Sequence, residues 1–139
     1  MKVREVMHKG ATWVKPSISV SKLARKMRQE DIGAVPVGED DRLIGMVTDR
    51  DICCRGAGNS RDISLLTARD VMSKPILYCE ADQDVQTAVR AMRKAKVRRL
   101  PVIDKNRRMV GMLGLGDIAA KASRETSATA LKALAAHHR

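Results

Sequence analysis

The sequence predicts an α+β fold made of two copies of one β-α-β-β-α unit. Three observations predict it. The chain repeats itself, each copy carries an apolar stripe of helical spacing, and each copy carries two short apolar strands. The repeat is read from VREVM (3–7) and ARDVM (68–72), from AVPV (34–37) and RLPV (99–102), and from GMVTDRDI (45–52) and GMLGLGDI (111–118).

Each element of the unit has its own local signal. Extended pieces at 11–14 and 75–79 come first. A helix follows, because apolar residues recur at the i, i+3, i+4, i+7 positions of one helix face. Two strands joined by a polar turn come next, and a second helix begins near the Asp of the repeated phrase. The helix stripes are Val20, Leu23, Ala24 and Met27, with Ser19 as N-cap, and Val85, Ala88, Val89 and Met92, with Asp84 as N-cap; the strands are 34–38 with 42–47 and 99–104 with 108–113.

The repeat divides the chain of 139 residues into three parts. Repeat 1 is expected at 1–65, with a Gly-, Asn- and Ser-containing linker at 56–67. Repeat 2 is expected at 66–124, and a helical tail at 125–139. A unit of about 60 residues has a thin core. We therefore expect the two units to pack about a pseudo-twofold axis, with clefts where they meet.

Composition indicates which partners, location and metal sites to expect. The net charge is +11, which favours an anionic partner. No apolar run is long enough to cross a membrane and none resembles a secretory signal, so we expect a cytoplasmic protein without membrane insertion. The three cysteines fit neither a disulfide framework nor a CxxC zinc site, and no metal site is expected.

The phrase GMVTDRDI holds the best candidate for a site. Thr48 and Asp51 have the spacing of a helix N-cap and its third residue, which by itself indicates a capping pair. A helix start also favours phosphate, and a carboxylate can accept hydrogen bonds from two vicinal hydroxyls. The second copy keeps Asp117 but has Gly114 in place of the threonine.

These motifs, in the same order twice between residues 3 and 122, resemble a pair of CBS domains, also called a Bateman module, of the stand-alone bacterial type. The resemblance implies an adenosine-nucleotide site in which Asp51 binds the ribose and Thr48 contacts phosphate. It also implies that Arg98 and Arg99 contact phosphate and that the base lies between an extended segment and a strand. The residues expected at this stronger site are Thr48, Asp51, Arg50, Thr12, Trp13, Val14, Pro16, Val35, Pro36, Arg98 and Arg99.

The second copy of the phrase predicts a weaker site, because the hydroxyl and the cation of the first copy are both glycine there. The residues expected at this site are Asp117, Gly114, Tyr78, Cys79, Leu100 and Pro101. The same resemblance implies a homodimer.

We therefore expect a regulatory protein that binds AMP, ADP or ATP, with NAD or S-adenosylmethionine as less favoured ligands, and signals to a partner protein by a conformational change. Catalysis is not expected, since His8, His137 and His138 are placed outside the repeat and none recurs. The alternative is a basic scaffold, or a nucleic-acid-binding module, without a small-molecule ligand; the charge favours it, but no aromatic stacking platform supports it.

Overall fold

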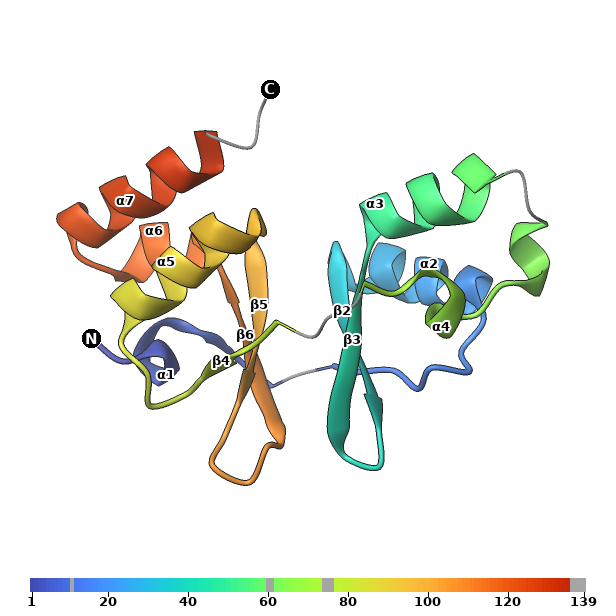
Figure 1. The fold of residues 1–139 in the computed structure, drawn as a ribbon, viewed down its shortest axis with the longest axis horizontal. Helices are drawn as coiled ribbons and strands as arrows, with labels where there is room; N and C mark the ends of the chain where they lie inside the picture. The colour runs from blue at the N-terminus through green and yellow to red at the C-terminus, as the bar shows by residue number, and fades with distance from the viewer. Residues whose placement is uncertain (11, 60–61, 74–76, 136–139) are drawn as a thin grey trace. The chain divides into compact units, whose positions relative to one another are not determined.

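The computed structural model describes residues 1–10, 12–59, 62–73 and 77–135, the side chains of 133 and 134 excepted (Figure 1). Helices and strands alternate along it as the repeat predicts, so the α+β fold of two β-α-β-β-α units is confirmed. Within the described residues no helix is long and apolar enough to cross a membrane. The chain forms two units, Thr12–Leu77 (unit 2) and Met1–Ala11 with Tyr78–Arg139 (unit 1).

Unit 2 contains one long helix, a hairpin and several short helical turns. The hairpin strands pair antiparallel, from Ala34 opposite Thr48 to Glu39 opposite Arg42. Two single bridges extend the hairpin: Val14 pairs parallel with Val37, and Ser73 pairs antiparallel with Met46. The elements are α2 Val20–Glu30, β2 Ala34–Glu39, β3 Arg42–Thr48, α3 Asp49–Asp51 continued by the π-helical turn Ile52–Gly56 and the 3-10 turn Ala57–Asn59, a 3-10 turn Ile63–Leu65, and α4 Ala68–Val71.

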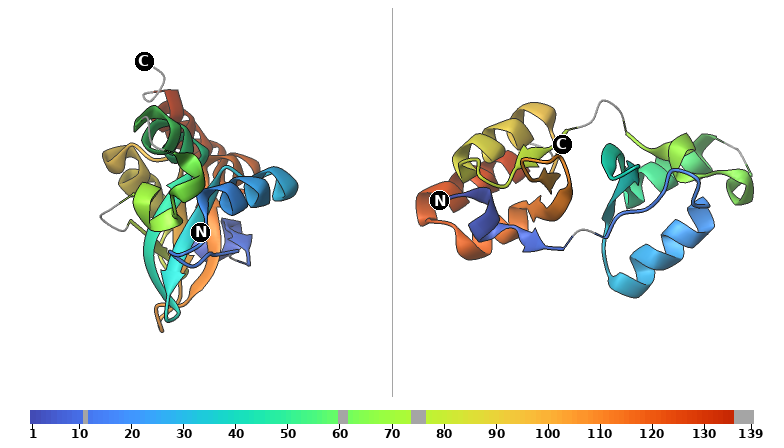
Figure 2. Two further views of the ribbon diagram at one scale, coloured as in Figure 1. Left: turned by 90° about the vertical axis from the view of Figure 1, so that its right-hand side faces the viewer. Right: turned by 90° about the horizontal axis from the view of Figure 1, so that it is seen from below.

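Unit 1 repeats this plan with longer edge strands and one more helix. Its sheet has the strand order β1-β6-β5-β4, in which β4 is parallel to β5 and β1 is antiparallel to β6. Helix α7 packs against α5 and α6 (Figures 1 and 2). The elements are α1 Val3–Val6, β1 His8–Lys9, β4 Cys79–Glu80, α5 Val85–Ala95, β5 Arg99–Ile103, β6 Met109–Gly114, α6 Leu115–Lys121 and α7 Arg124–Ala135.

The units and the sequence repeats have different boundaries. The first segment of repeat 1, α1, packs in unit 1, where Val3 and Val6 join the core formed with α5 and α6. The first segment of repeat 2, α4, packs in unit 2, where Ala68 and Val71 are buried. A four-residue helix cannot bury its apolar side by itself. Each short helix therefore completes the core of the unit that holds the other repeat.

Local signals explain the two long helices. The Ser19 hydroxyl accepts a hydrogen bond from the Lys22 N–H, and an Asp84 carboxylate oxygen accepts one from the Gln86 N–H, so both predicted N-caps are confirmed. The stripe prediction was wrong at Ala24, which is exposed. Its counterpart Val89 is buried in the core of unit 1, to which α7 contributes Ala130.

Two further sequence expectations need correction. Residues 12 and 13 are not in a strand, and Val14 makes a single bridge with Val37. The segment expected as a linker also contributes to a core, since Leu66 is buried in unit 2 and its carbonyl accepts the N–H of Val20. The second extended piece lies partly outside the described residues, and its described end is β4.

Candidate functional site

The first copy of the repeated phrase places Asp51 just after the end of β3. The Asp49 N–H donates to the Gly33 carbonyl (3.0 Å), which holds the start of the helix beside the start of β2. The Thr48 N–H donates to Asp51 Oδ2 (2.8 Å), and the Asp51 N–H donates to Thr48 Oγ1 (3.1 Å). Both side chains are half-buried. This reciprocal pair is a capping box, and it fixes the orientation of the carboxylate.

A third residue, Ser73, also holds the Asp51 carboxylate. The Ser73 hydroxyl donates to Asp51 Oδ2 (3.4 Å), and its backbone N–H donates to the Met46 carbonyl (2.8 Å). Sequence reasoning missed Ser73, because it comes from the start of the other repeat. Oδ2 thus receives two hydrogen bonds, whereas no described residue donates to Oδ1. The second oxygen of this carboxylate remains an available acceptor.

The Thr-x-x-Asp pattern alone does not mark a site. It occurs a second time in unit 2, at Thr67 and Asp70, where the Thr67 N–H donates to Asp70 Oδ2 (2.8 Å) and caps α4. Asp70 is exposed, whereas Asp51 is half-buried. Partial burial and the contact with Ser73 therefore distinguish Asp51 from an ordinary capping residue.

The second copy of the phrase, in unit 1, keeps the hydrogen bond from the backbone N–H to the aspartate but has different side chains around it. The Gly114 N–H donates to Asp117 Oδ2 (3.0 Å), as Thr48 does to Asp51. Across the sheet, Gly114 lies opposite Arg99, whereas Thr48 lies opposite Ala34. A Cβ on Gly114 would lie 3.7 Å from Arg99 Cγ. In the two units the smaller and the larger residue of this pair thus lie on opposite strands, and a side chain at position 114 would make ordinary van der Waals contact with the arginine stem.

The two predicted arginines lie in unit 1, at the start of β5 and opposite the end of β6. The Leu115 N–H donates to the Arg98 carbonyl (3.1 Å), which is the counterpart of the bond from Asp49 to Gly33. Arg98 and Arg99 are both exposed. Their predicted contribution to the Asp51 site therefore concerns residues of the other unit, and it stays a prediction.

His8 was wrongly placed outside the repeat. It lies in β1 opposite Met112, in the register position that Ser73 has opposite Met46. The signal is present in the sequence, because MHKG at 7–10 and MSKP at 72–75 continue the repeat of VREVM and ARDVM at the same offset. His137 and His138 lie outside the described residues.

The remaining residues predicted for the stronger site all lie in unit 2, where some of them are buried and the others are exposed. Val14 N–H donates to the Pro36 carbonyl (3.0 Å), which joins the extended segment to β2. Val14 and Val35 are side chains of the core. The buried members are Val14, Pro16, Val35 and Pro36, and the exposed members are Thr12, Trp13 and Arg50.

The residues predicted for the weaker site all lie in unit 1. Tyr78 is exposed, whereas Cys79, Leu100 and Pro101 are buried. The Cys79 thiol lies 3.9 Å from the Pro101 carbonyl oxygen. Burial raises the pKa of Cys79 to about 12. This thiol is therefore a packing group of β4 that stays protonated at neutral pH.

The two glycines that open the repeated phrase have a packing role. A Cβ on Gly45 would lie 2.7 Å from Met72 Sδ, and a Cβ on Gly111 would lie 2.5 Å from the His8 carbonyl oxygen. Both blocking residues belong to the short segments exchanged between the repeats. The glycines thus allow each segment to approach the strand that leads to the carboxylate.

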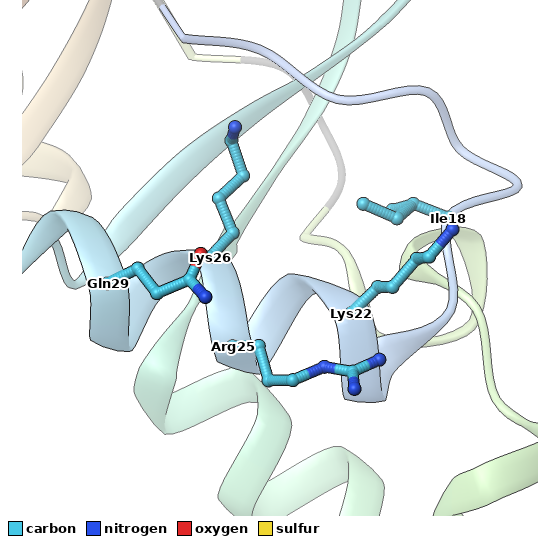
Figure 3. A pocket seen from close by; sticks show the side chains of 5 residues that line it. All are labelled: Ile18, Lys22, Arg25, Lys26 and Gln29. Carbon is cyan, nitrogen blue, oxygen red and sulfur yellow. The ribbon is translucent and has the colours of Figure 1, made fainter.

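Two further features of the described residues concern metal binding and a surface hollow. No group of three or more His, Cys, Asp or Glu side chains within the described part of the chain is placed to hold a metal ion. A shallow hollow lies along the outer face of α2 (Figure 3). It contains no carboxylate and is lined by Ile18, Lys22, Arg25, Lys26 and Gln29.

Comparison with known proteins identifies the family. The CBS domain model matches residues 3–55 and 68–124, which are the two copies of the repeat. The chain belongs to the CBS-domain family. Hypoxic response protein 1 of Mycobacterium tuberculosis is 39% identical to this CBS-domain pair over 117 residues, which are 84% of this chain and 81% of that protein.

Solved structures of CBS-domain pairs agree with this membership. The crystal structure of Hypoxic Response Protein I, with two coordinated zinc ions, is 37% identical, with a TM-score of 0.80 over 88% of this chain and all of that one. CBSX2 in complex with AMP is 25% identical, with a TM-score of 0.76 over 87% and 95%. The CBS pair of MJ0100, with 5′-methylthioadenosine and S-adenosylmethionine, is 24% identical, with a TM-score of 0.77 over 86% and 98%, and shows the shared fold alone.

Proposed function

We propose that this chain is a regulatory CBS-domain pair that binds an adenosine nucleotide, with Asp51 as the acceptor of the ribose hydroxyls. Its family membership and the AMP complex of CBSX2 support an adenosine ligand. The observation that carries the proposal is how the two oxygens of the Asp51 carboxylate are hydrogen-bonded. Its Oδ2 is held by Thr48 and Ser73, and its half-buried side chain leaves Oδ1 without a described donor.

This arrangement suits a vicinal diol. A carboxylate has about four acceptor positions, and two of those on Asp51 are used inside the protein. The orientation of the group is therefore fixed before a ligand arrives, which lowers the entropy cost of binding. Thr48 Oγ1, at the same helix start, is the group we assign to phosphate.

Asp117 forms the second, weaker site of the proposal. Its carboxylate has the same backbone anchor as Asp51 but no threonine hydroxyl beside it. Arg99 lies opposite Gly114 across the sheet instead, and a guanidinium can bind phosphate through paired hydrogen bonds. Both sites then use an aspartate as the ribose acceptor, but they bind phosphate through different side chains.

The nucleotide is proposed as a signal and not as a substrate. AMP, ADP and ATP are the favoured ligands, and NAD and S-adenosylmethionine share their adenosine part. Binding would favour one arrangement of the protein over another, and a partner protein would recognise the favoured one. A cytoplasmic homodimer is part of this proposal.

A calorimetric titration with AMP, ADP, ATP, NAD and S-adenosylmethionine tests the proposal. We expect saturable binding of at least one of the first three, and its loss in Asp51→Ala. Asp117→Ala should have the smaller effect. Absence of heat for all five ligands would refute the nucleotide proposal, and a folded Asp51→Ala protein of unchanged affinity would refute the ribose assignment.

A further inference from the structure

The positive charge of the chain is concentrated in unit 1. Unit 1 holds 16 Lys and Arg against 7 Asp and Glu, a net charge of +9, while unit 2 holds 11 against 9, a net charge of +2. The two units descend from the same repeat and have the same plan. The difference therefore comes from substitution at surface positions and not from the requirements of the fold.

One short segment of unit 1 contributes most of this charge. No acidic residue occurs between Asp84 and Asp104, over the length of α5 and β5. Six cationic side chains occur in the ten-residue stretch 90–99, and all six are exposed. This basic cluster consists of Arg90, Arg93, Lys94, Lys96, Arg98 and Arg99.

The corresponding segment of unit 2, residues 20–38, carries a smaller net positive charge, because it also contains Glu30 and Asp31. Lys22, Arg25 and Lys26 project from α2 (Figure 3), but Lys26 Nζ lies 3.2 Å from Glu30 Oε2. Asp31 then ends the helix, at the position that Lys96 has in unit 1. Gly33 and Ala34 stand where unit 1 has its two arginines.

Within the basic cluster, Arg90 Nη2 donates to Thr87 Oγ1 (3.3 Å), a neutral partner that leaves the charge of the guanidinium in place. Within the described residues no carboxylate lies within 4.0 Å of the charged groups of Arg90, Arg93, Lys94, Lys96 or Arg99. Cations in the last turn of α5 interact favourably with the helix dipole, but this stabilisation is confined to the end of the helix and does not extend to the arginines of β5. Like charges three and four residues apart repel each other. The like charges of Arg90, Arg93 and Lys94 on α5 therefore cost stability in the free protein, and an anionic partner would remove this cost.

We propose that the basic cluster binds the phosphate backbone of a nucleic acid. An acidic protein surface is the competing partner, but protein interfaces contain exposed aromatic or large apolar anchors and are depleted of lysine. The large apolar side chains exposed in the described residues are Met1, Trp13, Ile63, Leu65, Leu77, Tyr78 and Leu131, and none falls within residues 90–99. A surface of Arg and Lys without such anchors suits a sequence-independent phosphate contact.

The duplication provides a matched control for this proposal. Arg90 and Arg93 occupy the helix positions that Arg25 and Arg28 occupy in α2, and all four are exposed. Arg90→Gln with Arg93→Gln removes two charges from the cluster, and Arg25→Gln with Arg28→Gln removes two from unit 2. Neither pair includes a residue assigned to the nucleotide site, so the result does not depend on the proposed function.

The probe is a labelled 20-nucleotide DNA, single-stranded and as a duplex, titrated with the full chain at 50 to 200 mM salt. Six phosphate contacts predict a slope of log K against log salt of about −4 for the single strand. The Arg90/Arg93 variant should reduce this slope by about 1.4 and weaken binding roughly tenfold or more at 100 mM salt. The Arg25/Arg28 variant should bind like the wild type.

Three results would overturn the proposal. The first is no binding of either DNA at 50 mM salt. The second is an equal loss in both variants, which would show attraction by net charge alone. The third is equal affinity for poly-glutamate of the same charge, which would indicate an acidic protein partner. Circular dichroism and thermal unfolding check the fold of each variant, and Arg90→Glu with Arg93→Glu provides a stronger perturbation of the same positions.

Discussion

Replacement of Gly111 by alanine should release the β1 segment from unit 1. The new methyl group would lie 2.5 Å from the His8 carbonyl oxygen and 2.9 Å from Met7 Sδ. The first of these atoms is backbone, so β1 must move away from β6 and weaken the pairing of His8 with Met112. Overpacking costs about 1–3 kcal/mol and a lost hydrogen bond about 1 kcal/mol, so we expect a loss near 2–3 kcal/mol.

Alanine substitutions at two other glycines, Gly45 and Gly116, are the controls for this prediction. In Gly45→Ala the blocking atom is Sδ of the flexible Met72 side chain, at 2.7 Å, so we expect a loss of only about 1 kcal/mol. In Gly116→Ala no atom lies within 4 Å of the new methyl group, and helix propensity should stabilise the protein by up to about 1 kcal/mol. Urea unfolding measures all three changes. A Gly111→Ala protein as stable as the wild type would refute the packing role given to this glycine.

Two further predictions concern the thiols and the second copy of the phrase. Native protein treated with a thiol reagent at pH 8 should show two reactive thiols, Cys53 and Cys54, which are exposed, and a third only after unfolding. Because the pKa of Cys79 is raised from 9.0 to about 12 in the folded state, its burial should also cost stability as pH rises from about 9 toward 12; three thiols reacting at once would contradict both statements. Gly114→Thr should give Asp117 the hydroxyl partner that Thr48 gives Asp51, raising nucleotide affinity at the second site in calorimetry; unchanged affinity would show that the hydroxyl is not what distinguishes the sites.

The sequence predicted the regular elements well because their signals are local. The apolar stripes of α2 and α5, the two N-caps and the four hairpin strands follow from patterns within about ten residues. The short helices at Val3–Val6 and Ala68–Val71 were not predicted, since four residues are too few to show a helical period. Their exchange between units depends on contacts between distant segments, which a single sequence does not display.

The candidate site was only partly predictable for the same reason. The pair of Thr48 and Asp51 is three residues apart and was found. Ser73 reaches Asp51 through a bridge between segments 27 residues apart, and Arg99 faces Gly114 only because of strand register. The second copy thus pairs its glycine with a long side chain on the neighbouring strand, whereas the first copy pairs its threonine with Ala34, and the sequence alone did not show this exchange.

The central claim is that Asp51 is a ligand acceptor as well as a helix cap, and one pair of variants separates these roles. Asn at position 51 can still accept the Thr48 N–H through its one carbonyl oxygen, but its NH₂ group cannot accept a ribose hydroxyl. Asp70→Asn is the matched control, because Asp70 caps α4 in the same way.

Calorimetric titration of both variants with AMP, after a check that both unfold like the wild type, is the most direct measurement. We predict that Asp51→Asn loses most of its affinity at the stronger site and that Asp70→Asn retains it. Equal affinities in the two variants would show that Asp51 is a capping residue only, and would contradict the account.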